Sequence, residues 1–262
     1  SCAHAGRTPA LPGCGWLKIS APGYRQPERD AVELKETIQQ QFGSVAEQYA
    51  TSAVHSAGPD LAALVAAVPA GITRALDLGC GPGHTTLALA AHAAEVIGLD
   101  LTAGMLDRAR ALAAERAIGN VRFEYGDAEQ IPYADQSFDL VASRYSAHHY
   151  PHPAQALHEI HRVLRPGGIL LLADVVAPSS AVVDTHLNTI ELLRDPSHVR
   201  DHRIDEWLAL LQAAGLPAEL IGSWPIRLEF RVWTARMQTP EPAVQQIRTL
   251  LDHAPAEVRT AL

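Results

Sequence analysis

The sequence predicts a doubly wound α/β fold, in which a largely parallel sheet carries helices on both faces. Five short apolar runs recur between residues 75 and 174, and helical stretches separate most of them. Parallel strands need crossover helices of this kind, and a change of winding direction places the helices on both faces. Three glycines follow the first run, where such a sheet turns into its first helix. The expected fold is therefore Rossmann-like.

Helices are expected before the sheet. The pattern from residue 31 to about residue 67 is helical, with breaks at Gly43 and at Gly58-Pro59. Ser44 and Asp60 are suitable N-cap residues for the helices that follow these breaks. We expect this segment, which includes Tyr49 and His55, to form a lid.

The predicted strands are Ala75–Leu78, Glu95–Asp100, Val121–Tyr125, Phe138–Ser143 and Ile169–Asp174. Pro166-Gly167-Gly168 ends the helix at 154–165 and turns the chain into the fifth strand. A helical insertion near 178–202 and an amphipathic helix at Ile204–Ala214 should follow. Residues 226–233 alternate like an antiparallel strand, and a last helix is expected after them.

Composition limits the domain count and the partners. We expect residues 31–262 to form one domain and residues 1–30, which are rich in glycine and proline, to be a disordered extension. The net charge of -8 and the absence of Lys/Arg blocks argue against nucleic acid. No apolar run reaches the roughly 18 residues that span a bilayer, and three scattered cysteines suit a reducing compartment. We expect a cytoplasmic monomer or homodimer.

The glycine-rich loop, DLGCGPG at 77–83, predicts a nucleotide-type ligand. Its glycines let the backbone approach a ligand closely at a helix N-terminus. The spacing is not that of the dinucleotide motif, and the carboxylate of Asp77 would repel a pyrophosphate. S-adenosylmethionine carries an ammonium and a sulfonium and no phosphate, so this loop favours it.

Two further acidic residues end predicted strands. Asp100 ends the second strand, at a separation from the loop that suits a ribose diol. Asp127 follows the third strand and can accept from an adenine amine, while Leu101 and Met105 offer apolar walls. Any one of these features is weak evidence, because an acidic residue at a strand end often caps the next helix. Their order along one sheet is harder to explain by packing alone.

Four segments resemble one enzyme family. DLGCGPG, VIGLD, GDAEQIPYADQSFDLV and VLRPGGILLLAD together are similar to class I methyltransferases of the ubiquinone/menaquinone-biosynthesis type, the methyltransferase type 11 family. The resemblance covers about residues 40 to 235. It implies a seven-stranded sheet whose last strand is antiparallel. The residues expected at the donor site are Asp77, Gly79, Cys80, Gly81, Gly83, Asp100, Leu101, Met105, Gly126, Asp127, Ala128 and Ser143.

The acceptor should bind beside the loop after the fourth strand, because the ligand crevice opens where strand order reverses. That loop contains His148 and His149, and a histidine with its ordinary pKa can take a proton from an acceptor at neutral pH. A packed or capping histidine is an equally good interpretation of either residue. The loop, with DPSHVRDHRIDEWL, also resembles small bacterial methyltransferases of unassigned substrate, which implies that Asp195 and His198 close over the acceptor.

Asp174 ends the fifth predicted strand and could reach the same cavity, although a helix cap is the more common role. His148 and His152, or His198 and His202, have helical spacing for a shared metal. We expect no metal, because proline disrupts the first pair and methyl transfer needs none.

The expected activity is S-adenosylmethionine-dependent methyl transfer to a small, phenolic or quinone-like molecule. Two alternatives remain from the sequence. One is a non-catalytic protein that senses S-adenosylmethionine or a metabolite, and the other is a nicotinamide dehydrogenase on the same fold.

Overall fold

The computed structural model describes residues 28–262, and its centre is a five-stranded parallel sheet of order β3-β2-β1-β4-β5. The strands are β1 (Ile72–Leu78), β2 (Ala93–Asp100), β3 (Val121–Tyr125), β4 (Phe138–Arg144) and β5 (Leu164–Ala173). Their order reverses between β1 and β4, which pair in parallel. The predicted doubly wound fold and all five predicted strands are confirmed.

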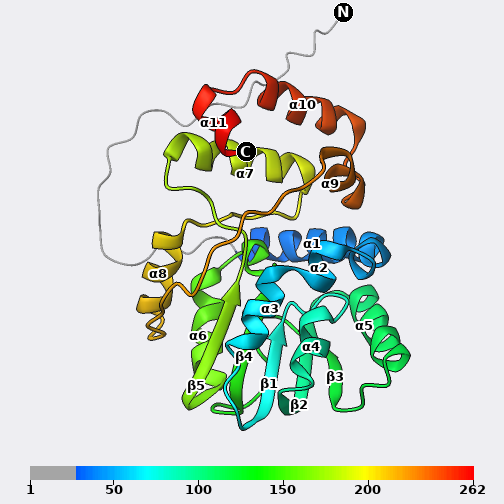
Figure 1. Cartoon of the computed structure of the whole chain (residues 1–262), viewed down its shortest axis with the longest axis vertical. Helices are drawn as coiled ribbons and strands as arrows, with labels where there is room; N and C mark the ends of the chain where they lie inside the picture. Colours follow the sequence, from blue (N-terminus) through cyan, green and yellow to red (C-terminus); the bar gives the residue numbers. More distant parts are fainter. Residues whose placement is uncertain (1–27) are drawn as a thin grey trace, which may run out of the picture.

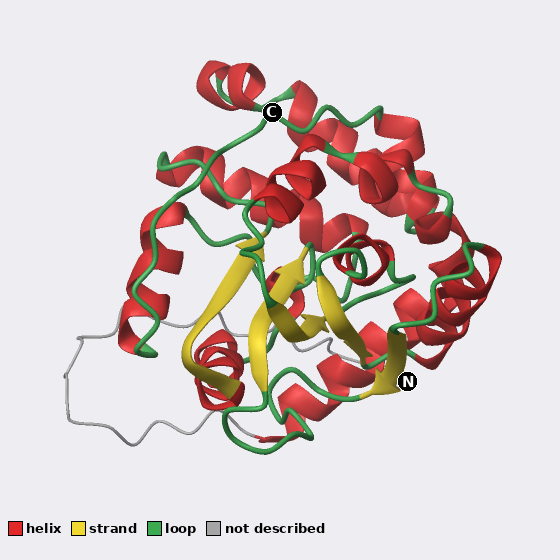
Figure 2. Cartoon of the chain, turned by 60° about the horizontal axis from the view of Figure 1, so that its bottom comes forward, coloured by secondary structure: helices red, strands yellow, loops and turns green. Residues whose placement is uncertain are grey.

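Helices cover both faces of the sheet (Figure 2). The covering helices are α3 (Pro59–Ala66), α4 (His84–Leu89), α5 (Ala103–Glu115), α6 (Pro153–Val163) and α8 (Ile204–Ala213). Successive side chains of a strand point to opposite faces. Leu76 and Leu78 therefore join the core beneath α6 and α8, whereas Ala75, which precedes them, joins the core beneath α3 on the other face. Both faces of β1 are buried, as expected for a central parallel strand.

A layer of helices lies over the carboxyl ends of the strands (Figure 1). α1 (Glu28–Ala50) and α2 (Ala53–Ala57) cross these ends, and α7 (Ala181–Arg194), α9 (Phe230–Arg236), α10 (Glu241–Asp252) and α11 (Ala256–Ala261) lie beyond them. The outer helices have small cores of their own, one of which contains Ile190, Trp233 and Ile247. Gln41 of α1 donates a hydrogen bond to the backbone oxygen of Met237, which follows α9, at 2.7 Å. This bond joins α1 to the outer helices.

The predicted breaks in the N-terminal helices are only partly right. α1 runs without interruption through Gly43, so Ser44 caps no helix and its hydroxyl donates instead to the carbonyl of Gln41. A glycine inside a helix costs about 1 kcal/mol, which close packing offsets here. The backbone of Gly43 lies against Gly104 at the start of α5. The second break is real, but α3 begins at Pro59, and Asp60 binds an arginine instead of capping the helix.

The predicted antiparallel strand is wrong, and the sheet has five strands where the family resemblance implied seven. Residues 216–229 have no regular secondary structure, and Phe230 begins α9. The carboxylate of Glu229 accepts from the backbone N–H groups of Arg231 and Val232, so it caps this helix where the alternation had predicted a strand. Ile226 is 41% exposed, and the alternating pattern therefore has no sheet face to cover.

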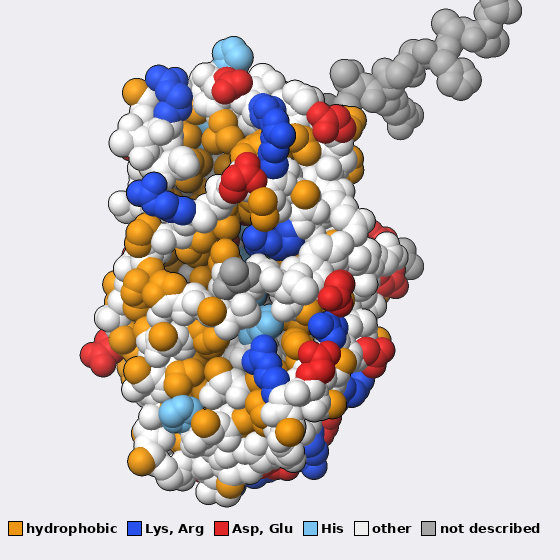
Figure 3. Space-filling view, turned by 45° about the vertical axis from the view of Figure 1, so that its right-hand side comes forward, with side chains coloured by type: hydrophobic (Ala, Val, Ile, Leu, Met, Phe, Trp, Pro, Cys, Tyr) orange, Lys and Arg blue, Asp and Glu red, His pale blue; other side chains and the backbone are white. Residues whose placement is uncertain are grey.

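The expected extension falls outside the described residues, apart from 28–30, which begin α1. No helix among residues 28–262 has the length and apolar character to cross a bilayer. On the face shown in Figure 3, the described side chains of both charges lie between hydrophobic ones and form no extended basic stripe. Cellular location, oligomeric state and the absence of nucleic-acid binding stay predictions.

Candidate active site

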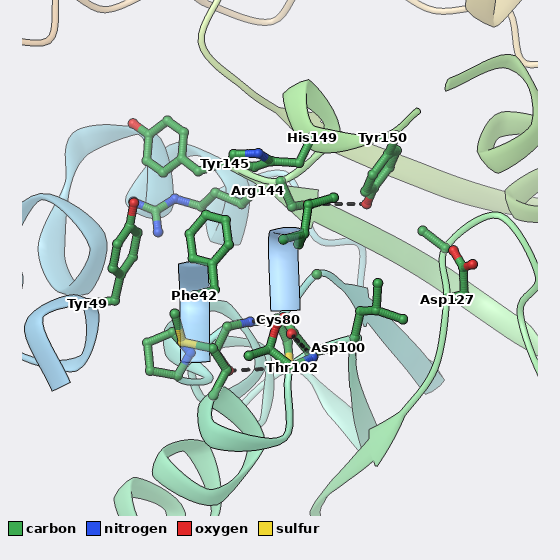
Figure 4. Close-up of a pocket in the computed structure, with 18 of the residues that line it drawn as sticks. Phe42, Tyr49, Cys80, Asp100, Thr102, Asp127, Arg144, Tyr145, His149 and Tyr150 are labelled. Atoms are coloured by element: carbon green, nitrogen blue, oxygen red, sulfur yellow. Dashed lines mark hydrogen bonds between the residues drawn. The ribbon is translucent and has the colours of Figure 1, made fainter. Parts of the chain in front are cut away.

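One cavity opens at the carboxyl ends of the strands, beside the point where strand order reverses. The loops after β1, β2, β3 and β4 line it from below, and α1 covers it. Asp127 lies at one side of this cavity and Tyr49 at the other, with Phe42 between them (Figure 4). The cavity therefore has two ends. The donor end contains the glycine loop, Asp100 and Asp127, and we call the other end the aromatic compartment. The aromatic compartment is lined by Phe42, Tyr49, His55, Tyr145 and His149.

The glycine loop forms the floor of the donor end. Gly79 has φ +64° because it turns the chain beneath Ser146, and a Cβ atom there would lie 2.5 Å from the Cβ of Ser146. Gly81 has φ +51°, but a Cβ atom there would meet nothing within 4 Å. The loop is thus packed tightly on one side and open toward the cavity at Gly81.

Asp100, at the end of β2, holds the loop in place. One carboxylate oxygen accepts from the backbone N–H of Gly81 at 2.8 Å, and the other accepts from that of Thr102 at 2.8 Å. Burial raises the pKa of this carboxyl, while these hydrogen bonds act to lower it. Each oxygen keeps a second lone pair, so Asp100 can still accept from the hydroxyls of a ligand.

Asp77 does not line the cavity, which corrects the sequence argument from charge. Its side chain is 1% exposed and accepts from the hydroxyl of Thr86 at 2.6 Å beneath the loop. Burial raises its pKa to about 7 despite that hydrogen bond. An acidic residue that ends a central strand is covered on both faces, so it supplies no fixed charge at the cavity mouth.

Asp127 is at the cavity as predicted, but α1 contributes a partner that the sequence did not reveal. Lys35 donates to Asp127 at 2.7 Å and to Glu129 at 2.6 Å. The other oxygen of Asp127 accepts from the backbone N–H of Glu129 at 2.8 Å. Leu101 and Met105 form apolar walls nearby, and Ala128 completes the lining on this side.

Five rings follow one another across the aromatic compartment. The centroid of Phe42 lies 4.8 Å from that of His149 and 5.4 Å from that of Tyr49. Tyr49 lies 4.6 Å from His55, and His55 lies 5.7 Å from Tyr145. Edge-to-face arrangements at such separations are favourable for aromatic rings. The expected lid residues Tyr49 and His55 are therefore cavity walls.

Arg144, which the sequence did not single out, connects β4 to the lid. Its guanidinium pairs with Asp60 and donates to the backbone oxygens of His55 at 2.8 Å and Val54 at 3.1 Å. Arg144 is 7% exposed, and its cation also lies 4.6 Å from the ring centroid of Tyr145. This side chain fixes α2 and α3 over the aromatic compartment.

His149 lies in the short helix η1 (Ala147–His149) and is the predicted base that reaches the cavity. Its Nδ1 is 3.0 Å from the backbone oxygen of Ser197. A carbonyl only accepts, so Nδ1 must carry the proton and Nε2 keeps the lone pair of the neutral ring. Asp195 lies 4.0 Å from that Nε2 and also accepts from Ser197. Burial and the positive charge of His148 lower the pKa of His149.

His148 points away from the cavity. Its Nδ1 contacts Asp174 at 2.6 Å, and its backbone N–H donates to the same carboxylate at 2.9 Å. Burial by itself lowers the pKa of His148, but the charge of Asp174 outweighs it and raises that pKa to about 9. Asp174 is therefore the partner of His148 and does not cap α7, whose N-cap is Ser180. His198 is 5% exposed, does not line the cavity, and lies 3.1 Å through Nε2 from the side-chain oxygen of Asn188.

The predicted site residues thus divide into two groups. Those that line the cavity are Gly79, Cys80, Gly81, Asp100, Leu101, Met105, Gly126, Asp127, Ala128 and His149. Those that the structure places beneath or behind the lining are Asp77, Gly83, Ser143, His148 and His198. Ser143 is completely buried and binds the hydroxyls of Ser146 and Tyr150. Within residues 28–262, no cluster of three or more His, Cys, Asp or Glu side chains has the arrangement of a metal site.

Comparison with known proteins gives consistent results. A family model described as "Methyltransferase domain" matches residues 76–172. The "Uncharacterized methyltransferase YcgJ" of Bacillus subtilis is 39% identical over 219 residues, which cover 83% of this chain and 87% of that protein.

Two more comparisons extend this likeness. A demethylmenaquinone methyltransferase of Deinococcus radiodurans is 34% identical over 165 residues, which cover 60% of this chain and 68% of that protein. The crystal structure of a putative methyltransferase of Bacillus halodurans superposes with a TM-score of 0.75 at 34% identity, and covers 78% of this chain and 89% of that one.

Proposed function

This chain belongs to the methyltransferase family and uses S-adenosylmethionine, and from that premise we propose that it methylates a small phenolic or quinone-like molecule. The observation that carries the proposal is the continuity of the cavity. The donor end, built on the glycine loop and Asp100, opens directly into the aromatic compartment. A flat, apolar acceptor suits these walls, since binding sites are mostly apolar with a few convergent polar groups.

The donor end fits S-adenosylmethionine. The backbone at Gly81 faces open space, Asp100 has lone pairs for ribose hydroxyls, and Leu101 and Met105 can enclose a flat base. Asp127 can accept from an amine on that base with the lone pairs that Lys35 leaves free. When bound, S-adenosylmethionine supplies an electrophilic methyl group on a sulfonium.

The residues of the chain would bind and orient the acceptor and take its proton. Methyl transfer is an in-line displacement, so the main task of the compartment is to hold the acceptor at the right distance and angle. Phe42 and His149 would orient its ring. We propose that Nε2 of His149 takes the proton of the acceptor, because Ser197 fixes the proton on Nδ1. Asp195 then stabilises the imidazolium.

A turnover assay tests the proposal. The full chain, S-adenosylmethionine and a panel of phenols and quinols should give S-adenosylhomocysteine and a methylated product. Amine and nucleic-acid substrates serve as negative controls in the same assay. Methylation confined to those controls would contradict the proposal, and so would donor binding without turnover of any phenol or quinol.

A further inference from the structure

A second and larger cavity adjoins the aromatic compartment. It is a groove of about 1500 Å³ between β5, α3 and α8, and we call it the β5 groove. Its lining is mostly apolar and includes Leu170, Leu172, Val176 and Trp207. Among residues 28–262, Tyr145 is the one residue that lines both the active-site cavity and this groove. The two spaces therefore meet at Tyr145.

The neighbours of Tyr145 lie on opposite sides of this boundary. Arg144 lines the active-site cavity and Asp60 lines the groove, and the two side chains form an ion pair with each other. The consecutive residues Val54 and His55 divide in the same way, with Val54 on the groove side. Their backbone oxygens both accept hydrogen bonds from the guanidinium of Arg144. The boundary is therefore a single layer of residues, held together by the arginine.

A strained backbone holds the ring of Tyr145 in this boundary. Tyr145 follows β4 with φ +54°, in the left-handed region that residues with a side chain rarely adopt. Such a conformation persists where the surroundings fix it. Here the backbone N–H of Tyr145 donates to the carbonyl of Ala173 at 2.9 Å, and the cation of Arg144 lies 4.6 Å from the ring centroid (Figure 4). Glycine would adopt this φ without strain, so the strain points to a role for the ring.

We propose that Tyr145 limits the size of the methyl acceptor by closing the aromatic compartment against the β5 groove. The inference rests on the proposed function and narrows its substrate class to compact phenols or quinols with short substituents. The row of rings from His149 through Phe42, Tyr49 and His55 ends at Tyr145. An acceptor that extends away from His149 along these rings therefore meets Tyr145. Burial raises the pKa of Tyr145 to about 12, so its neutral hydroxyl belongs to a wall and supplies no base.

Alkylphenols of increasing chain length test this limit. Phenols with a methyl, propyl or hexyl group at the meta or para position are titrated into the full chain with saturating S-adenosylhomocysteine, and calorimetry measures each dissociation constant. The wild type should bind the methyl compounds best in both series, because longer chains meet Tyr145. Tyr145→Gly should reverse this order in at least one series, since each methylene that reaches the apolar groove strengthens binding about fourfold.

Further variants separate the ring from the backbone. Tyr145→Phe keeps the ring and should keep the preference for short chains. Ala117→Gly is the matched control for relief of strain, because Ala117 is exposed after α5, has φ +52° and lines neither cavity. It should leave the order of affinities unchanged. Thermal unfolding verifies that each variant is folded, and Tyr145→Ala, which should show the same reversal, replaces the glycine variant if that one is unstable.

Several outcomes would overturn the inference. They are wild-type affinity that does not fall with chain length, an order that Tyr145→Gly leaves unchanged, or a reversed order in Tyr145→Phe or Ala117→Gly. Failure of S-adenosylhomocysteine or of every phenol to bind would instead refute the proposed function, so the two failures are distinguishable. Short chains preferred by the wild type and by Tyr145→Phe, with long chains preferred by Tyr145→Gly, support the size limit.

Discussion

The two ends of the cavity differ in how the chain builds them. The donor end comes from three consecutive loops of one sheet, so Asp100, Asp127 and the glycine loop meet because their strands are neighbours. The aromatic compartment comes from α1, α2 and the β4 loop, and the segment after α7 supports its His149 from behind. Only tertiary packing brings these parts together. Local sequence therefore specifies the donor end, whereas long-range contacts specify the aromatic compartment. Each prediction below perturbs one end and asks whether the other responds.

The largest effect is expected at His149. His149→Ala should lower turnover about 10²- to 10⁴-fold, the usual contribution of a positioned base. Donor affinity should stay the same, because His149 belongs to the compartment. Steady-state kinetics and calorimetry measure the two quantities, and His158→Ala, on an exposed position, is the control. A parallel loss of donor affinity would show that the two ends are not separate.

The next largest effect is on stability, and it concerns the ion pair of Asp174 with His148, the neighbour of His149. Asp174→Asn removes the carboxylate that raises the pKa of His148 to about 9 from an ordinary value near 6.5. A raised folded-state pKa stabilises the protein fully below pH 6.5, and this stability is lost as pH rises through 9. The variant should therefore cost about 2–3 kcal/mol at pH 6 and much less at pH 10.

Denaturant unfolding at the two pH values measures this difference. Asp205→Asn, on an exposed and surface-paired carboxylate, is the control. The same loss of stability for Asp174→Asn at both pH values would mean that the ion pair with His148 is not its cause.

A smaller loss is expected at the donor end. Asp100→Ala should weaken binding of S-adenosylmethionine by about 1–3 kcal/mol, because ligand hydroxyls lose a charged acceptor and Gly81 loses its partner. Asp107→Ala, on the exposed face of α5, should have no effect. An unchanged dissociation constant for Asp100→Ala would remove this carboxylate from the donor site.

The smallest predicted effect concerns the ion pairs that Lys35 of α1 makes with Asp127 and Glu129 at the donor end. Lys35→Met should change donor affinity by only a few-fold, because partly exposed ion pairs contribute about 0–1 kcal/mol. The difference between variant and wild type should shrink further in high salt. A salt-independent loss would indicate that Lys35 acts by packing.

The sequence predicted the fold and most of the donor end, because apolar runs and helical patterns are local and the three loops follow the strands directly. It chose the right ligand partly for a wrong reason, since Asp77 is buried beneath the loop and supplies no charge at the mouth. The alternation at 226–233 failed because the cap at Glu229 starts a helix there. Arg144 and Lys35 could not be found, since each acts through a partner more than 80 residues distant.

The sequence also could not distinguish the roles of His148 and His149. Adjacent histidines in one loop look alike in sequence, and only the orientation of each ring separates a cavity wall from a buried partner of Asp174. The lone pair at Nε2 of His149 depends on a carbonyl at Ser197, in a segment that follows α7.

A crystal structure with S-adenosylhomocysteine tests the central claim, that one cavity joins the donor end to the aromatic compartment. The account predicts the adenine between Leu101 and Met105, the ribose hydroxyls at Asp100, and the sulfur facing Phe42 and His149. A sulfur atom that faces away from these rings, or a ligand bound outside this cavity, would contradict it.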